Sequence, residues 1–359
     1  MYIPQQIYKF NSSRIIFKLS FNVKHGETIK IVRILTKENV AELLNMIDAL
    51  KYVEDAYKQL TLGNAFVPQR IAITDPAPGL TLVMPGIIGG EMNALATKIV
   101  SVYKKNPEKY NMPTVLAKIM IQDINTGDIV GIMDGSLITA MRTGAATGVS
   151  VKYLARKDST TMSIYSAGVQ ARKQVSGVYY GLNQKLEKCK VFDFKKDTTE
   201  SFKSEIEKEL GIEVEITDSG DDLLSNSDII VAATTSTTPI FAGDKVPEGV
   251  HISSIGAHAP DARELDSTTI KRASLLTAGL KEACLAEAGD YIIPIEEGII
   301  SKDDVISIGS IITGKRNSRI SESEITIFKS VGISAQDVAV GKLVYDRALK
   351  EGVGQNIDF

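Results

Sequence analysis

The sequence predicts an α/β protein of two domains, in which an antiparallel or mixed sheet is followed by a doubly wound parallel sheet. Two observations carry this prediction. The chain has 359 residues, 43% of them hydrophobic and 24% charged, which is enough for two globular domains with buried cores. From Thr161 onward, strand patterns and helix patterns alternate, and such alternation is typical of βαβ units with parallel strands.

Composition and charge exclude several kinds of partner. The formal net charge is −3 and no long Lys/Arg block is present, which argues against nucleic acid or an anionic membrane and favours a small molecule. Cys189 and Cys284 lie far apart without metal-site spacing, so neither a disulfide framework nor a zinc site is expected. Because no apolar run approaches the ~20 residues of a membrane span and no signal-peptide pattern opens the chain, we expect a cytoplasmic protein without membrane contact.

The first part of the chain reads as an extension, a helix, a sheet and a second helix. Residues 1–28 follow no clean period and are expected to form an added strand or a poorly ordered extension. A helical pattern starts at Lys37, with Thr36 as its N-cap. Short strand patterns such as LTLVMP, ATKIVSVY and AKIMIQD fill residues 71–134, and a helix is expected from about Thr139 to Leu154.

Strands and helices alternate after that second helix. TMSIYSA reads as a strand, a helical stripe runs from Ala171 to Leu182, and CKVFDF reads as the next strand. The pattern continues through an amphipathic helix and the strand segments VEITD, DIIVAATT and HISSIGA. The C-terminal AQDVAVGKLVYDRALKEGVG reads as an amphipathic helix that stops at Gly352. Because this helix lies outside the alternating block, we expect it to pack back on the first domain.

The turn after TMSIY has the spacing of a dinucleotide-binding fingerprint. In that fingerprint a first Gly makes the tight turn, a second lets the pyrophosphate approach, and a third position allows close helix packing. These slots hold Ser166, Gly168 and Ala171. The small side chain of Ser166 would fit if its φ stays negative, and its hydroxyl could contact a phosphate. Asp193, at the end of the next strand, would bind ribose hydroxyls and favour NAD, although the two lysines that follow leave NADP open. The alternative is an ordinary strand-to-helix turn.

Three cations stand in apolar or small-residue surroundings. Arg70 lies at the edge of a strand, Lys98 lies within ALATKIVSV, and Arg142 lies within LITAMRTGAATG. A buried charge is costly unless it is paired, and a substrate carboxylate could supply the pairing, with Arg suited to bidentate contact. A structural salt bridge is an equal alternative for each cation, and Asp123 and Asp134 are candidate protein partners.

Ordered motifs along the chain carry a resemblance to a family. They are VRILTKENV, TKIVSVYKKNPEKYNMPTV, DINTG, ITAMRTGAATGVSVKYLARKDS, SAGVQA, SSIGAHAPDARELD and SEITIFKSVGISAQDVAVGKLVYDRALKEGVG. From about Ile31 to its end, the sequence resembles the ornithine cyclodeaminase/mu-crystallin family. The resemblance implies a substrate-binding and dimerisation domain (29–142 and 330–359) completed by the C-terminal helix, and a Rossmann domain (143–329). It also implies a homodimer, and redox chemistry at the α-carbon of a small amino or imino acid with NAD, NADP not being excluded; residues 1–28 have no counterpart.

The same resemblance implies roles for individual residues. Arg70, Lys98 and Arg142 match the family's substrate-carboxylate and catalytic cations. Cofactor contacts are implied for Thr114, Ser166, Ala167, Gly168, Val169, Gln170, Ala171, Asp193, Thr234, Thr235 and Gly256. The small-residue segment RTGAATG would let its helix pack closely on the cofactor.

One departure from the family pattern concerns the substrate. Ornithine cyclodeaminases carry an Asp in the loop where SIGAHAPD places His258, and a neutral His offers no fixed negative charge for a second amine. Ornithine is therefore disfavoured and an alanine-dehydrogenase-like activity is favoured, with His258 either in an acid/base role or without chemistry. Ornithine cyclodeaminase and pyrroline-2-carboxylate or ketimine reductase are the alternative enzymes. A catalytically silent crystallin-like binding protein is the alternative outside enzymes.

Overall fold

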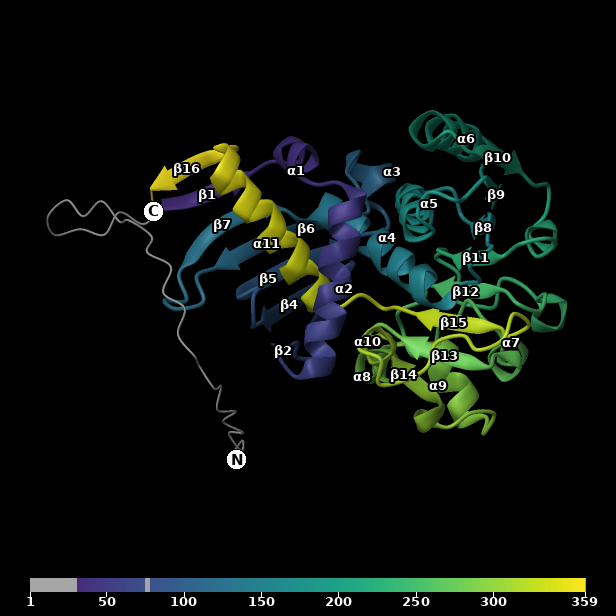
Figure 1. Ribbon diagram of the computed structural model, residues 1–359. Coiled ribbons are helices and arrows are strands. Elements are labelled where there is room, and N and C mark those ends of the chain that lie inside the picture. Colours follow the sequence, from purple (N-terminus) through teal and green to yellow (C-terminus); the bar gives the residue numbers. More distant parts are fainter. Residues whose placement is uncertain (1–30, 75–77, 359) are drawn as a thin grey trace, which may run out of the picture.

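The protein consists of two lobes, each built on one sheet, with helix α4 (Gly135–Leu154) running between them (Figure 1). The computed structural model describes residues 31–74 and 78–358. The extension predicted for residues 1–28 lies outside the described residues. Among the described residues, no helix combines the length and the apolar character that crossing a bilayer requires.

The first lobe is built on sheet A, whose strand order is β16-β1-β7-β6-β5-β4-β2, with β3 also paired to β4. Its strands are β1 (Ile31–Leu35), β2 (Ala65–Phe66), β3 (Ile71–Ile73), β4 (Leu80–Ile88), β5 (Ala94–Val102), β6 (Val115–Gln122), β7 (Ile129–Asp134) and β16 (Gln355–Asp358). β1 pairs with β7 in parallel, while the other strand pairings described for this sheet are antiparallel, so the sheet is mixed. The last strand of the chain thus lies beside the first described strand.

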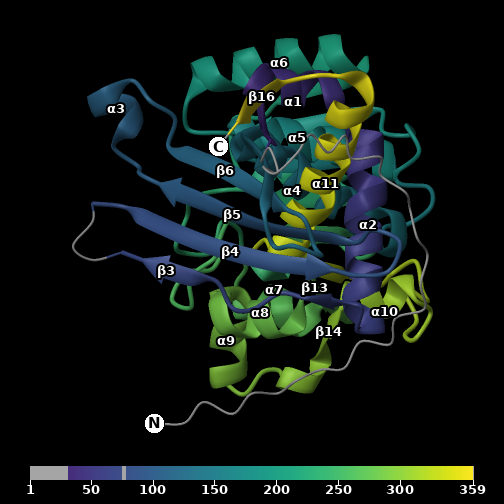
Figure 2. The ribbon, with the colours of Figure 1, turned by 90° about the vertical axis from the view of Figure 1, so that its left-hand side faces the viewer.

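Helices pack on one face of sheet A (Figures 1 and 2). They include α1 (Lys37–Leu43), α2 (Met46–Leu62) and α11 (Ser334–Glu351); the short α3 (Asn106–Tyr110) follows β5. Thr36 caps α1 as predicted, but the helical pattern is divided because Asn45 caps a new helix, accepting from Asp48 N at 2.9 Å. α11 packs against β4, β5 and β6 and ends at Gly352, which has φ +73°, as expected for a helix stop. The predicted return of the C-terminal helix to the first lobe is confirmed.

Helix α4 joins the lobes through a backbone-to-backbone contact with α5 (Val169–Gly181). α4 starts four residues before the predicted Thr139 because Asp134 accepts hydrogen bonds from two N–H groups of its first turn. Gly144 and Gly148 face Gly177 and Gly181, and a Cβ on Gly177 would lie 2.0 Å from Gly144 O. The glycines of this segment thus admit the neighbouring helix, and its expected packing on the cofactor stays a prediction. The domain boundary after residue 142 falls within α4 and stays a prediction.

The second lobe is a parallel sheet B of order β10-β9-β8-β11-β12-β15-β13-β14. Its strands are β8 (Thr161–Tyr165), β9 (Lys188–Phe192), β10 (Glu213–Ile216), β11 (Ile229–Ala232), β12 (His251–Ser254), β13 (Leu275–Ala278), β14 (Val305–Ser307) and β15 (Thr326–Lys329). Its helices are α5, α6 (Lys196–Leu210), α7 (Ser267–Arg272), α8 (Lys281–Glu287), α9 (Gly289–Glu296) and α10 (Ile308–Ile312), and the 3₁₀ turns are η1 (Asp221–Leu223), η2 (Gly243–Lys245) and η3 (Lys302–Asp304).

Alternate residues of the central strands enter different cores, so sheet B is covered on both faces. Ile229 and Val231 pack with α5 and α6, whereas Ile230 packs with α7, α8 and α9. The strand order reverses at β8, and a doubly wound sheet binds its ligand beyond the carboxyl ends of the strands at that point. The predicted fold class is confirmed.

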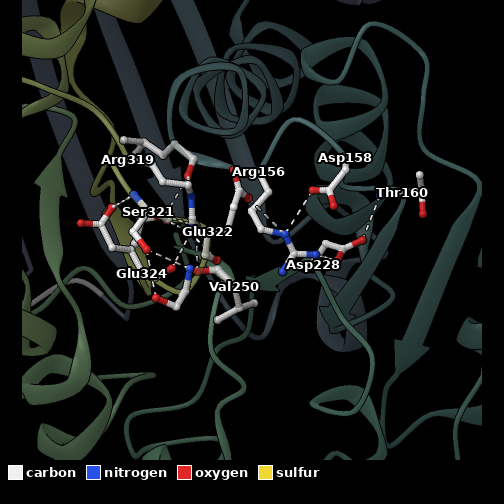
Figure 3. A network of polar contacts seen from close by, with 12 residues as sticks. Arg156, Asp158, Thr160, Asp228, Val250, Arg319, Ser321, Glu322 and Glu324 are labelled. Atoms are coloured by element: carbon white, nitrogen blue, oxygen red, sulfur yellow. Dashed lines mark hydrogen bonds and ion pairs between the residues drawn. The ribbon is translucent and has the colours of Figure 1, made fainter.

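Polar contacts fix the opposite, amino-terminal edge of sheet B (Figure 3). Arg319 donates to Leu154 O at 2.9 Å, to Val250 O at 3.3 Å and to Thr326 Oγ1 at 3.2 Å. Asp228 accepts from Thr160 N at 2.9 Å and from the guanidinium of Arg156. These contacts tie the starts of four strands together and leave the carboxyl edge for ligands.

Candidate active site between the two lobes

Two of the three predicted cations share one buried carboxylate. Lys98 in β5 and Arg142 in α4 are 2% and 6% exposed. Asp337, in the first turn of α11, places Oδ2 at 2.6 Å from Lys98 Nζ and Oδ1 at 3.1 Å from Arg142 Nε. Neither expected partner pairs with these cations, because Asp134 caps α4 and contacts Lys118, and Asp123 accepts from its own turn.

Burial gives Lys98 an unusual acidity. Loss of hydration lowers the pKa of its ammonium to about 8, against the opposing attraction of Asp337, and the positive charges of Arg142 and Arg70 lower it further. Arg142 is held in place by a second contact, in which its Nη1 donates to Gln336 Oε1 at 2.8 Å. An amine with a pKa near 8 can exchange a proton at physiological pH, as a general acid or base must.

Arg70 is held at the contact between the lobes. It lies between β2 and β3, donates from Nη1 to Val331 O at 3.1 Å, and forms an ion pair with Glu287 at the end of α8. Burial lowers the pKa of its guanidinium, with Glu287 acting in the opposite direction. Arg70 and Glu287 line a cavity of about 150 Å³, together with apolar side chains that include Met84 and Ile333. Val331 follows β15, so this cavity lies beside the carboxyl edge of sheet B.

The turn after β8 has the backbone of a glycine. Ser166 has φ +103°, so the condition of a negative φ is not met, and the residue adopts a backbone conformation that favours glycine. Its hydroxyl accepts from Gly168 N at 3.3 Å, within the turn itself. Asp193 follows β9 and accepts from Ala167 N at 2.9 Å, which ties the turn to the next strand. Gly168 is the N-cap of α5, whose first N–H groups have no side-chain cap among the described residues, an arrangement that can hold an anion.

The remaining residues of this turn fill the positions expected from the fingerprint. Ala171 is fully buried against the sheet, whereas Val169 is 74% exposed. Gln170 has a buried Oε1 without a hydrogen-bond partner among the described residues. Close packing at Ala171 thus brings the start of α5 to the carboxyl end of β8, as a dinucleotide site requires.

One buried carboxylate organises the loops after β11 and β12. Glu264 accepts from Thr234 N at 2.7 Å and from Gly256 N at 2.7 Å. Gly256 approaches Thr234 so closely that a Cβ would lie 2.2 Å from Thr234 O, whereas the neighbouring Thr235 is exposed. The structure thus brings Thr234, which follows β11, and Gly256, which follows β12, together at the carboxyl ends of these strands. Thr235 lies at the surface there.

His258 and Thr114 differ in how they relate to the cations. His258 lies exposed in the loop after β12, with Nδ1 at 3.0 Å from Gly256 O. Enough protein surrounds it that partial loss of hydration lowers the pKa of its imidazole, and the charge of Arg70 contributes. Thr114 precedes β6, five residues before Ile119, the strand partner of Lys98. Five residues span about 17 Å of strand, so the structure does not bring Thr114 beside Lys98.

Comparison with known proteins identifies the relationship. A model of the ornithine cyclodeaminase/mu-crystallin family matches residues 31–352. The chain belongs to this family. A Δ(1)-pyrroline-2-carboxylate reductase of Bacillus cereus is 32% identical over 328 residues, which are 91% of this chain and 99% of that protein. The alanine dehydrogenase of Archaeoglobus fulgidus is 34% identical over 327 residues, 91% of this chain and 98% of that protein.

A solved structure extends the likeness to the whole fold. The Thermococcus litoralis Δ(1)-pyrroline-2-carboxylate reductase in complex with NADH and L-proline is 40% identical, with a TM-score of 0.87, and the match covers 91% of this chain and 100% of that chain. The resemblance predicted from the motifs is therefore confirmed. The named relatives are reductases and a dehydrogenase of imino and amino acids, the class of activity that the sequence analysis expects for this family member.

Sequence reasoning missed the carboxylates that hold the site. Asp337 and Glu287 stand far along the chain from the groups they contact, whereas Glu264 lies 30 residues from Thr234 and 8 from Gly256. Asp337 lies in the first turn of a helix, where an acidic residue is common for reasons of the helix dipole alone. The one available signal was the excess of buried cations, which required partners that neither Asp123 nor Asp134 supplies.

Proposed function

We propose that this protein is an NAD-dependent oxidoreductase that acts at the α-carbon of a small amino or imino acid. One observation carries the proposal: Lys98, Arg142 and Arg70 converge from sheet A and α4 on the carboxyl edge of sheet B. Three cations at one place can bind a carboxylate, and the guanidinium of Arg is suited to a bidentate contact with it. The carboxylate would then lie beside the edge of sheet B at which a doubly wound fold binds its cofactor.

The residues that follow β8 fit a dinucleotide. The N–H groups at the start of α5 would hold the pyrophosphate, and Asp193 would accept from the ribose hydroxyls, since each of its oxygens takes a single backbone N–H. A carboxylate there repels a 2′-phosphate, which favours NAD over NADP. The 40% identical structure holds NADH, and an archaeal alanine dehydrogenase structure, 33% identical with a TM-score of 0.85, holds NAD.

The protein's side chains would bind the substrate and transfer the proton. Bound NADH supplies the hydride. Arg70 and Arg142 hold the substrate carboxylate, so that the α-carbon is fixed relative to the loops after β11 and β12. Lys98 Nζ polarises the substrate or transfers a proton near the α-carbon, a role that its lowered pKa suits. Asp337 keeps Lys98 and Arg142 in place and partly neutralised.

The first substrate to test is a cyclic imino acid such as pyrroline-2-carboxylate. The relatives named above support it, and the apolar cavity of about 150 Å³ beside Arg70 offers room for a small ring. Reductive amination of pyruvate is the second candidate, supported by the 34% identical alanine dehydrogenase and favoured by the sequence motifs. Ornithine ranks third, because His258 provides no fixed carboxylate for its second amine.

A substrate panel separates these candidates. Purified protein is incubated with NADH and pyrroline-2-carboxylate, with NADH, pyruvate and ammonia, or with NAD and ornithine, and turnover is followed at the nicotinamide absorbance band. Turnover with an imino or keto acid is expected. If no substrate is turned over and NADH does not bind at high micromolar concentration in a fluorescence titration, the catalytically silent binding protein replaces this proposal.

We also propose a cytoplasmic homodimer formed through the uncovered face of sheet A. Along β5, buried residues facing the helices alternate with half-buried ones and with Ile99, which is 40% exposed; at the sheet edge, Ile71 is 61% exposed. Exposed β-branched residues on an open sheet face indicate an interface. The archaeal alanine dehydrogenase structure is described as a dimer. Ile99→Lys is expected to give monomers in sedimentation; a wild-type protein that sediments as a monomer would contradict the proposal.

A further inference from the structure

The ion pair between Arg70 and Glu287 joins the two lobes at the proposed substrate site. Arg70 belongs to the first lobe, and Glu287 is the last residue of α8 in the second. Their side chains are 12% and 15% exposed, and both line the cavity of about 150 Å³. A residue that binds the substrate carboxylate is therefore already in contact with a carboxylate of the protein.

The position of Glu287 is unfavourable in every respect except its contact with Arg70. The carboxyl end of a helix carries partial negative charge, so a carboxylate in the last turn is repelled. Partial burial also raises the pKa of Glu287, with Arg70 acting in the opposite direction. Neither helix stability nor burial therefore explains why a Glu stands at this place. The remaining explanation is the effect of Glu287 on Arg70 and on the cavity.

The ion-paired charges of the site have a single positive excess. Lys98 and Arg142 share Asp337, and Arg70 is paired with Glu287, so three cations face two carboxylates. One substrate carboxylate neutralises the remainder. Among the described residues that line the cavity, Arg70 is the one cation, and Glu282 adds a second acid. A second carboxylate on the substrate would enter a cavity whose cation is already paired.

We propose that Glu287 determines specificity for monocarboxylates, by holding Arg70 paired and by placing a negative charge in the wall of the cavity that receives the substrate side chain. The inference rests on the proposed function and names the substrate class of that site: α-imino or α-keto acids with one carboxylate and an uncharged side chain. Discrimination arises from repulsion of the wrong ligand, a common route to specificity. Like charges brought together in a partly desolvated site change affinity by about 10- to 100-fold.

The test compares matched substrates in wild type, Glu287→Gln and Glu287→Asp. The measured quantity is the ratio of kcat/KM for oxaloacetate to that for pyruvate, each with NADH and ammonia. Gln keeps the shape and can still accept from Arg70 but removes the charge, so the ratio is expected to rise about 10- to 100-fold. Asp keeps the charge, and its ratio is expected to stay near the wild-type value. Glu282→Gln, which removes an exposed charge at the same cavity, is the matched control and is expected to change the ratio less than threefold because water screens it.

A binding measurement keeps this inference separate from the proposed function. Succinate and propanoate are titrated calorimetrically into each variant in the presence of NADH. A rise in the succinate-to-propanoate affinity ratio in Glu287→Gln supports the inference even if no substrate is turned over, in which case the proposed activity alone fails. A purely structural role of Glu287 would weaken both ligands equally. If both ratios, of turnover and of binding, stay unchanged in Glu287→Gln, the inference is overturned.

Discussion

Ser166→Gly is expected to stabilise the protein although it removes a side chain. A serine held at φ +103° carries strain of about 1–3 kcal/mol, which glycine does not. Against this, glycine makes the unfolded chain more flexible, at about 0.4–1 kcal/mol. The hydrogen bond from Gly168 N, at 3.3 Å and partly exposed, contributes about 0.5 kcal/mol. A net stabilisation of about 1 kcal/mol remains, which raises the unfolding midpoint of a lobe of this size by about 2–4 °C.

The assay is thermal unfolding of Ser166→Gly beside Ser166→Ala, together with NADH titration of each. Ala keeps the Cβ that strains the turn and loses the hydroxyl, so it is expected to be no more stable than wild type. In Ser166→Gly, the N–H of Gly168 is released from Ser166 Oγ and can meet a phosphate, so NADH affinity is expected to be unchanged or higher. A lower midpoint, or NADH affinity weakened tenfold in both variants, would refute the reasoning and assign the hydroxyl to the cofactor.

Three further predictions follow. Lys98→Ala is expected to abolish turnover while NADH affinity, by fluorescence titration, stays within about threefold; in wild type, kcat for reduction falls above pH about 8, because burial lowers the pKa of the ammonium that donates the proton. Asp337→Asn leaves two buried cations unpaired, so it is expected to cost about 3–5 kcal/mol in chemical unfolding and to shift that pH limit lower. Arg319→Met removes contacts at the amino edge of sheet B, so its midpoint is expected to fall with kcat/KM unchanged.

The architecture could be predicted because its signals are local. The alternating elements of sheet B follow from patterns within segments of three to fifteen residues, and the family model covers nearly the whole described chain. The pattern that starts at Lys37 also predicts helix correctly, but it does not show that the segment forms two helices, α1 and α2. Asn45 caps a new helix with a side chain that leaves the hydrophobic period almost unbroken, so only the capping chemistry indicates the break.

The partners of the charged residues could not be predicted, because they are set by the packing of distant elements. Lys98 and Arg142 were recognised as cations in apolar surroundings, yet their common partner Asp337 lies 195 residues from Arg142 along the chain. The φ of Ser166 was missed for a different reason. A serine in the first glycine slot suggested a relaxed backbone, whereas the surrounding β8 and α5 hold the glycine conformation and the serine accommodates it.

Helix α4 fixes the position of Arg142, a proposed substrate-binding cation, relative to the proposed cofactor-binding turn across the two lobes. Its first half carries Arg142 beside Asp337, and its second half packs through Gly144 and Gly148 on α5, whose first residue follows the Ser166–Gly168 turn. Helices in contact through bare backbone cannot slide without steric overlap, since interiors are close-packed. The distance between Arg142 and the proposed pyrophosphate-binding turn is therefore set by two helices in close contact. Relative motion of the lobes would instead change the contact between Arg70 and Glu287, which joins the two lobes.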